Sequence, residues 1–390
     1  MGASSTTQHE NAPLRVAIVG CGLIADAHLQ ELAKIPGARV VATCDKHLDL
    51  AMQAAQRFEV PHYYNDLKKM LEAERPDIVH ITTPAHTHSA LAQEIMIAGA
   101  HVYIEKPIAI DERELRDVLA TARAHGRICC PGHDQLCDPA WLALRERVEA
   151  GEIGDVRHVD SILGYAMSGQ FGSAVRSDAR HWVRQLPGGL FQNTISHPLY
   201  RITEYLTDER PAVIAQWWEK PGVGFPTEMF VHLRGANVTA SLTFSTTIAP
   251  QRMTRVYGTR GVLEVDLDAQ SVVRIAPSAL PGAFAKLDAP WRRSREARRA
   301  FWRNGWRFLR SDIHYFAGMR ILFERFQAAV RTSGAQWPVS AHEMLRVTRL
   351  MDDIFAACQK AEKERDTSAN GEREQAAPVK ALLVSTAGKP

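Results

Sequence analysis

The feature that most constrains this chain is the alternation of short β-branched runs with helical stretches between residues 14 and 130. A strand followed by a helix, repeated in this way, is typical of an α/β doubly wound parallel sheet. The predicted strands are Leu14–Val19, Arg39–Cys44, Asp77–Ile81, His101–Ile104 and Arg127–Cys130, and the predicted helices are Ala25–Lys34, Leu48–Phe58, Leu67–Glu74, Thr87–Ala98 and Glu112–His125. Residues 13–134 are therefore predicted to form the first domain.

The pattern changes after Pro139, where a predicted helix to about Ala150 is followed by strands. Those strands are Val156–Tyr165, Val213–Trp218, Glu228–Arg234, Val238–Thr246, Arg252–Tyr257, Val262–Asp266 and Val272–Ile275. Predicted helices at Gly189–Leu206, Asp312–Thr332 and Ser340–Glu364 complete an α+β domain with a large, mostly antiparallel sheet over residues 135–362. Segments 1–12 and 363–390 are predicted to be mobile tails.

Composition narrows the functional class. The formal net charge of +3 over 390 residues is too small to indicate a nucleic-acid partner. The six cysteines lack a repeated C-x-x-C spacing, and no apolar run approaches the ~18 residues of a membrane span. We expect a cytoplasmic protein with a small-molecule substrate and no nucleic-acid partner, and we expect it to be a homo-oligomer.

A glycine-rich turn joins the first predicted strand to its helix, and Gly20, Gly22 and Ala25 match the G-x-G-x-x-G/A pattern of dinucleotide-binding sites. Gly20 permits a tight turn, Gly22 lets the backbone approach a pyrophosphate, and Ala25 keeps helix and strand close. With Leu23 and Ile24, these residues bring the unpaired N–H groups of the helix N-terminus to the phosphates. The alternative is that the glycines only form a strand-to-helix turn.

Asp45 ends the second predicted strand, twenty-three residues after Gly22. A carboxylate there can accept hydrogen bonds from both ribose hydroxyls of the adenosine half, and it would repel a 2′-phosphate. NAD is therefore favoured over NADP, although the charge of Lys46 partly offsets the repulsion. The alternative is that Asp45 is a helix cap before Leu48.

Three segments together point to a known family. GCGLIA, TTPAHTHSALAQEIMIAGAHVYIEKPIA and PGGLFQNTISH occur in an order and spacing that resemble the Gfo/Idh/MocA oxidoreductases, the family of glucose-fructose oxidoreductase and inositol dehydrogenase. The resemblance covers about residues 13–280 and is stronger over the first 130. It implies an N-terminal Rossmann domain, a C-terminal domain with an open-faced β-sheet, and an active site between them.

The resemblance makes Lys106 the first catalytic candidate. In the family, the lysine of the E-K-P motif, here Glu105-Lys106-Pro107, hydrogen-bonds the reacting oxygen and helps to move its proton. A lysine at the carboxyl end of a parallel strand is well placed to contact both cofactor and substrate. Glu105 and Pro107, the latter through a cis peptide, would orient it. Without the resemblance, Glu-Lys-Pro is more often a solvated turn.

His197 matches the histidine of the family pattern G-G-x-x-x-D-x-x-x-H, which begins here at Gly188. An imidazole can take up or release a proton near neutral pH as hydride moves. Asn193 stands where the pattern has Asp. It can hydrogen-bond a substrate hydroxyl, but it cannot ionise or orient an imidazolium as strongly. The alternative for His197 is a buried polar residue with satisfied hydrogen bonds.

The same resemblance assigns residues around these motifs. The predicted contacts near the nicotinamide are Thr83, Pro84, His88, Glu105 and Lys106. The predicted substrate contacts, which could instead be core aromatics, are Tyr165, His181 and Trp182. His86 and His88 form an H-x-H without a third ligand of suitable spacing, so no metal site is predicted.

The segment Trp291–Arg310 lies outside the family pattern. It reads WRRSREARRAFWRNGWRFLR, and on a helical wheel its aromatic side chains gather on one arc while arginines gather opposite. Such a basic amphipathic helix can lie on an anionic membrane or grip a phosphorylated substrate. It can also pack its aromatic face on the protein's own core or on a sister subunit.

Together these features predict an NAD-dependent oxidoreductase. It would transfer hydride between nicotinamide C4 and a secondary alcohol or ketone of a sugar, cyclitol or nucleotide-linked sugar. Lys106 would polarise the oxygen and His197 would shuttle the proton. Asn193 raises the alternative of a dinucleotide-binding regulatory protein without turnover. The arginine-rich segment raises the further alternative of a membrane-docked scaffold.

Overall fold

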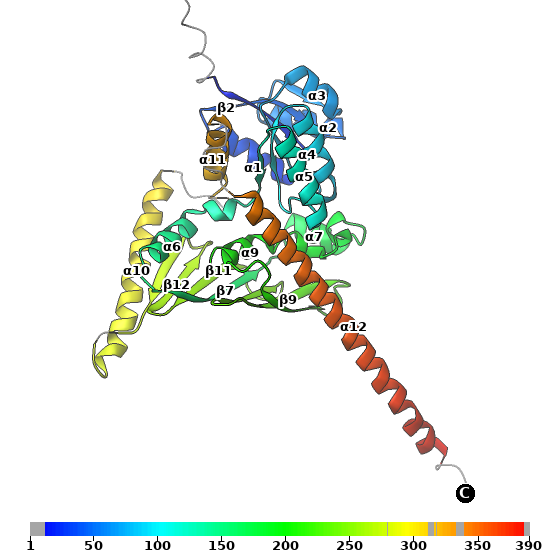
Figure 1. The fold of residues 1–390 in the computed structure, drawn as a ribbon, viewed down its shortest axis with the longest axis vertical. Coiled ribbons are helices and arrows are strands. Elements are labelled where there is room, and N and C mark those ends of the chain that lie inside the picture. Colours follow the sequence, from blue (N-terminus) through cyan, green and yellow to red (C-terminus); the bar gives the residue numbers. More distant parts are fainter. Residues whose placement is uncertain (1–11, 279, 311–315, 317, 333–338, 386–390) are drawn as a thin grey trace, which may run out of the picture.

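The structure is a computed structural model that describes residues 12–278, 280–310, 316, 318–332 and 339–385. Figure 1 shows two sheets in separate layers, the first with its helices above the second. Helices α6 and α9 lie between the layers, on the face of the second sheet that points toward the first. Within the described residues, no helix combines the length and the apolar character that a membrane crossing requires.

The first sheet has six parallel strands in the order β3-β2-β1-β4-β5-β6. Its strands are β1 (Leu14–Val19), β2 (Ala38–Cys44), β3 (His62–Tyr64), β4 (Ile78–Ile81), β5 (His101–Ile104) and β6 (Cys129–Pro131). Its helices are α1 (Leu23–Leu32), α2 (Leu48–Arg57), α3 (Leu67–Glu74), η1 (Ala85–Thr87), α4 (His88–Ile97) and α5 (Glu112–Ala124). The predicted doubly wound sheet is confirmed, and its order reverses between β1 and β4, where such sheets bind ligands.

The second sheet has seven strands in the order β13-β12-β11-β7-β10-β9-β8. They are β7 (Val156–Gly164), β8 (Ala212–Glu219), β9 (Pro226–Arg234), β10 (Thr239–Ser245), β11 (Gln251–Gly258), β12 (Gly261–Asp266) and β13 (Ser271–Ile275). Neighbours are antiparallel except β7 and β10, which pair in parallel. The predicted mostly antiparallel sheet is confirmed. Before it come η2 (Asp134–Cys137) and α6 (Pro139–Glu149).

The helix predicted over Gly189–Leu206 is wrong as a single element. The structure has α8 (Gly189–Gln192) and α9 (Ser196–Thr203), with Asn193 and two further residues between them. Pro198 has no N–H with which to continue a helical ladder from the preceding turn, whereas proline is tolerated in the first turn of a new helix. Two unpredicted elements, α7 (Gln170–Ser177) and η3 (Trp182–Gln185), precede α8.

The last helix, α12 (Ala341–Ser385), runs well past the predicted end at Glu364. Residues 363–385, predicted as part of a mobile tail, are helical in the structure, and Ala, Glu, Gln and Lys, which favour helix, are frequent there. The remaining parts of the predicted tails, 1–11 and 386–390, lie outside the described residues.

Helix α11 (Met319–Arg331) follows the second sheet in the chain but packs on the first. Leu322, Phe323 and Phe326 share one buried cluster with Leu29 of α1 and Tyr103 of β5. Arg320 adds an ion pair to Glu31 of α1, with Nε and Oε2 2.9 Å apart. The core of the first domain is therefore completed by a segment from the end of the chain.

Helix α10 (Phe284–Leu309) contains most of the predicted basic amphipathic segment and runs along the β13 edge of the second sheet (Figure 1). The aromatic face does not pack on the protein's own core, because Trp302 is 72% exposed and Phe308 73% exposed. The core beneath this edge is already filled by α6, whose Trp141 and Leu144 are fully buried against β12. That interpretation of the aromatic face is corrected.

Candidate active site

The glycine turn between β1 and α1 has the shape that a dinucleotide needs. Gly20 has φ +96°, and a Cβ there would lie 2.8 Å from the backbone of Thr82 and Thr83. A Cβ on Gly22 would instead project into open space, with no atom within 4 Å. Gly22 is the N-cap of α1 and makes no side-chain hydrogen bond; the Ala25 N–H donates to the Gly22 carbonyl at 3.1 Å, which leaves the N–H groups of Leu23 and Ile24 to bind an anion.

Asp45, at the end of β2, is hydrogen-bonded to the same turn. Its Oδ2 accepts from Cys21 N at 2.8 Å, and its Oδ1 accepts from His47 N at 2.9 Å. The N-cap of α2 is His47, which makes no side-chain capping bond, so Asp45 is not the cap of this helix. Each carboxylate oxygen retains a lone pair that can accept a ribose hydroxyl.

The loop after β4 is held in place by hydrogen bonds of Thr82 and His88. Thr82 Oγ1 donates to Gly20 O at 2.5 Å. The His88 ring is buried between two carbonyl oxygens, with Nδ1 2.8 Å from Pro107 O and Nε2 2.8 Å from Thr83 O. Burial lowers the pKa of His88, so the neutral ring donates to one of the two carbonyls. His88 therefore lies between the loop after β4 and the loop after β5, and its one N–H donates to one of them.

Lys106 follows β5 and is joined to Pro107 by a cis peptide bond. Its Nζ donates to the backbone carbonyl of Asn193 at 3.0 Å. Because the contact is to the backbone, it does not depend on the residue type at position 193. Burial lowers the pKa of Lys106, while the carboxylates of Glu105 and Asp134 oppose that shift.

Glu105 is buried and is hydrogen-bonded to α1 of the first domain. Its Oε1 is 3.0 Å from His28 Nε2, and its Oε2 accepts from Lys106 N at 3.2 Å. Burial opposes ionisation of Glu105, but the hydrogen bond from His28 keeps the pKa below its usual value. Behind it, His28 Nδ1 is 3.0 Å from His80 Nδ1. This buried chain of polar groups holds the backbone at Lys106 in place.

His197, in the first turn of α9, lies beside an acidic residue that the sequence analysis missed. Its Nδ1 is 3.9 Å from Asp134 Oδ1, and the two side chains are only 12% and 13% exposed. Among the residues that the structure describes, His197 Nδ1 has no hydrogen-bond partner. Burial and then the charges of His133 and Lys106 hold the pKa of His197 well below its usual value. The ring is therefore neutral and can accept a proton.

Asp134 begins η2, directly after the loop that follows β6. Burial and the nearby Glu105 carboxylate raise the pKa of Asp134 to about 7, although Arg252 and Lys106 oppose the shift. The one signal in the sequence was its position just beyond the carboxyl end of a parallel strand, where such sheets carry their functional residues. No motif marked it.

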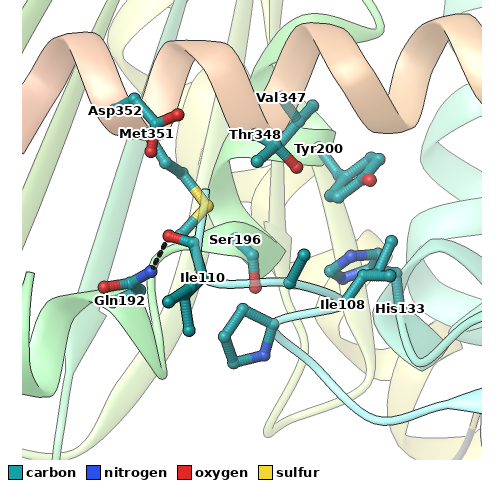
Figure 2. Close-up of a pocket in the computed structure, with 12 residues that line it drawn as sticks. Ile108, Ile110, His133, Gln192, Ser196, Tyr200, Val347, Thr348, Met351 and Asp352 are labelled. Carbon is teal, nitrogen blue, oxygen red and sulfur yellow. Dashed lines mark hydrogen bonds between the residues drawn. The ribbon is translucent and has the colours of Figure 1, made fainter. Parts of the chain in front are cut away.

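A small pocket with a volume of about 10 Å³ lies next to these groups (Figure 2). The loop after Lys106 forms its floor and α12 passes above it, with Gln192 Nε2 donating to Ile110 O at 2.5 Å. Three lining side chains have buried polar atoms without a partner in the described part of the chain, namely His133 Nδ1, Ser196 Oγ and Tyr200 Oη. A pocket of this size has room for about one water molecule, to which these polar atoms can hydrogen-bond.

The aromatic residues predicted to line a substrate pocket form two separate groups. His181 and Trp182 stack with ring centroids 5.8 Å apart, and Phe171 packs on the edge of His181. Tyr165 stacks on the buried Phe244 with centroids 5.9 Å apart. Tyr165 and Trp182 are both partly buried against the main core.

Comparison with known families matches both parts of the chain. Residues 14–133 match a family described as "Oxidoreductase family, NAD-binding Rossmann fold". Residues 141–264 match the "GFO/IDH/MocA C-terminal domain". Together the two matches span more than half of the chain.

Three curated relatives have moderate identity. The 4-carboxy-2-hydroxymuconate-6-semialdehyde dehydrogenase of Sphingobium sp. (strain NBRC 103272 / SYK-6) is 25% identical over 60% of this chain and 72% of its own length. The trans-1,2-dihydrobenzene-1,2-diol dehydrogenase of Mus musculus is 31% identical over 40% of this chain and 47% of its own length. The scyllo-inositol 2-dehydrogenase (NAD(+)) of Bacillus subtilis is 30% identical over 36% of this chain and 42% of its own length. The last two alignments span less than half of each relative.

Solved structures share the fold along nearly the whole chain. The WlbA dehydrogenase from Bordetella pertussis, solved with NADH and UDP-GlcNAcA, has a TM-score of 0.72 at 17% identity and covers 90% of this chain and 97% of its own. The myo-inositol 2-dehydrogenase from Lactobacillus plantarum has a TM-score of 0.69 at 19% identity and covers 90% and 98%.

Proposed function

The chain belongs to the Gfo/Idh/MocA family of oxidoreductases, and we propose that it interconverts a secondary alcohol and a ketone on a sugar, cyclitol or nucleotide-linked sugar. The observation that carries the proposal is the convergence of Lys106, His197 and Asp134 at the carboxyl ends of β5 and β6. The names of relatives support the substrate class, since they include an inositol dehydrogenase and a dehydrogenase solved with UDP-GlcNAcA.

The residues of the glycine turn fit a nicotinamide dinucleotide. The open space above Gly22 and the uncapped N-terminus of α1 suit the pyrophosphate, and Asp45 suits the adenosine ribose. When bound, the nicotinamide accepts or donates the hydride. We propose NAD as the preferred cofactor because the Asp45 carboxylate would repel a 2′-phosphate.

The chain's own residues move the proton. In the oxidative direction the alcohol oxygen loses its proton while the carbon loses hydride, so the site must hold one proton. Lys106 can donate a hydrogen bond to that oxygen and stabilise the charge that develops on it. His197, neutral and partly buried, can accept the proton. Reduction uses the same groups in reverse.

Asp134 takes the place of the carboxylate that the family pattern has at position 193. When ionised, it stabilises the imidazolium form of His197 across the 3.9 Å between Oδ1 and Nδ1. We therefore assign Asp134 as a positioning residue. This assignment removes the main reason for preferring a regulatory protein without turnover, which was the missing acid at Asn193.

Turnover tests the proposal directly. Purified protein with NAD and a panel of sugars, cyclitols and nucleotide sugars is expected to produce NADH, measured by its absorbance. Binding of NADH without turnover of any panel member would contradict an enzymatic role and favour the regulatory alternative.

Asp45→Ser is expected to lower the preference for NAD over NADP by roughly tenfold or more, because it removes both the ribose acceptor and the repulsion of the 2′-phosphate. The measurement is the ratio of the two dissociation constants, from cofactor fluorescence titration. Asp49→Ser, an exposed acid in the first turn of α2, is the matched control. An unaltered ratio in Asp45→Ser would show that this carboxylate only braces the glycine turn.

A further inference from the structure

Helix α10 is attached to the protein through one polar face. Arg303 donates to Gln270 O at 2.6 Å, and Asn304 donates to Ala269 O at 2.8 Å. Glu296 pairs with Arg147 of α6, with their nearest atoms 3.0 Å apart. Ala300 is the single buried residue of the helix. On a 100° wheel these inward residues span an arc of about 100°.

The opposite face of α10 is apolar and exposed. Eight of the 17 exposed large hydrophobic side chains in the described part of the protein belong to this helix. They are Phe284, Leu287, Trp291, Phe301, Trp302, Trp306, Phe308 and Leu309, each between 57% and 76% exposed. They fall within an arc of about 160°, centred opposite the attached face. A group of exposed apolar side chains of this size on a protein surface marks an interaction site.

The same helix carries a large positive charge. Residues 284–310 contain nine Lys or Arg against Asp288 and Glu296, which gives a formal charge of +7. Because the whole chain has +3, the rest of the protein has −4. The two acids are already paired, Asp288 with Arg292 at 2.7 Å and Glu296 with Arg147 at 3.0 Å. The field of the helix is therefore strongly positive.

Arginine and aromatic side chains are combined on the outer face. The Arg298 guanidinium lies 5.2 Å from the Trp291 ring centre, and that of Arg310 lies 4.6 Å from the Trp306 ring centre. Trp and Phe bury their rings at the boundary between headgroups and acyl chains, while Arg binds lipid phosphates. The outer face of α10 thus presents both groups that an anionic bilayer surface takes up.

We propose that α10 docks the protein on an anionic lipid bilayer, lying in the headgroup plane with its exposed aromatic face inserted. A second copy of the chain fits less well, because a two-fold contact through this face would bring two +7 helices together. The helix is about 39 Å long and lies at the outer edge of the second sheet, so a flat surface can reach it (Figure 1).

Vesicle co-sedimentation tests the docking. The full chain is expected to sediment with vesicles of phosphatidylserine and phosphatidylcholine and not with phosphatidylcholine alone. Binding should fall at least tenfold when salt is raised to about 1 M, where the Debye length is about 3 Å. Equal binding to neutral vesicles, or no binding to acidic vesicles at low salt, would overturn the proposal.

Substitutions identify the face. Trp302→Ser with Trp306→Ser is expected to weaken vesicle binding about tenfold or more without lowering the melting temperature, because both rings are exposed. Ile97→Ser with Ile214→Ser, at positions 60% and 68% exposed elsewhere, is the matched control and should bind as the parent does. A tryptophan variant that keeps its vesicle binding overturns the proposal. The proposal is also overturned if the parent does not bind vesicles and the tryptophan variant changes the oligomeric state in gel filtration. The aromatic face would then be a protein interface.

Discussion

Replacing Lys106 with alanine is expected to lower kcat by about 10²-fold to 10⁴-fold, the usual contribution of a positioned acid–base group. Binding of NAD should stay within about an order of magnitude, because the phosphates are assigned to the glycine turn rather than to this side chain. In the parent, Lys106 Nζ donates to the Asn193 carbonyl at 3.0 Å, and its charge lies near the buried carboxylates of Glu105 and Asp134, so the variant also loses these interactions. Steady-state kinetics and cofactor titration measure the two effects separately.

Lys69→Ala is the control for this change, because Lys69 belongs to the same domain and its side chain is 77% exposed. It should leave both kcat and cofactor affinity as they are. If Lys106→Ala turned over at the parent rate, the assignment of Lys106 to proton transfer would be wrong.

The second large effect is expected for Asp134→Asn. At 3.9 Å and an effective dielectric constant of about 20, an ionised carboxylate stabilises the charged imidazole by about 4 kcal/mol. A loss of about 1.4 kcal/mol, a third of that energy, already corresponds to a tenfold change in rate. We therefore expect kcat for alcohol oxidation at pH 8 to fall about tenfold or more. Because the pKa of Asp134 is raised to about 7, its carboxylate is ionised above that pH and protonated below it. The parent should therefore lose activity as pH falls through 7, and the pH–rate profile of the variant should lack this fall in activity near pH 7.

Two further variants distinguish the loss of the Asp134 charge from a general loss of structure at the site. Asp155→Asn removes a carboxylate that is 76% exposed and should leave the pH profile as it is. Adding Asn193→Asp to Asp134→Asn returns an acid four residues before His197, as in the family pattern, and should restore part of the lost rate. Persistence of the fall in activity near pH 7 in Asp134→Asn would show that a different group titrates there.

The parallel sheet was predictable because five of its six strands are marked by the local sequence. Runs such as His101–Ile104 are apolar and β-branched, and stop signals such as Gly99 separate them from helices. The strand His62–Tyr64 was missed since three residues at a sheet edge carry no periodicity. The glycine turn and Lys106 were predictable for a different reason, because both belong to motifs with fixed spacing.

The supports of the site could not be predicted in the same way. His28 and His80 are 52 residues apart in the chain, and nothing in either neighbourhood indicates that their rings meet behind Glu105. Asp134 contacts His197 only because η2 and α9 pack against each other. The amphipathic wheel of α10 correctly separated its two faces, but it could not tell which face the protein would use, and the polar one is attached.

The return of α11 to the first sheet has a consequence for the order of events during synthesis. The rings of His28, His80 and Tyr103 all pack against Phe323, with centroid distances of 4.7 to 5.2 Å. Phe323 is made about 190 residues after β6 ends. As the nascent chain leaves the ribosome, its first domain can pair every strand yet must keep one apolar face uncovered until nearly the whole protein has emerged. Chaperones that bind exposed apolar surface therefore have a long interval in which to engage it.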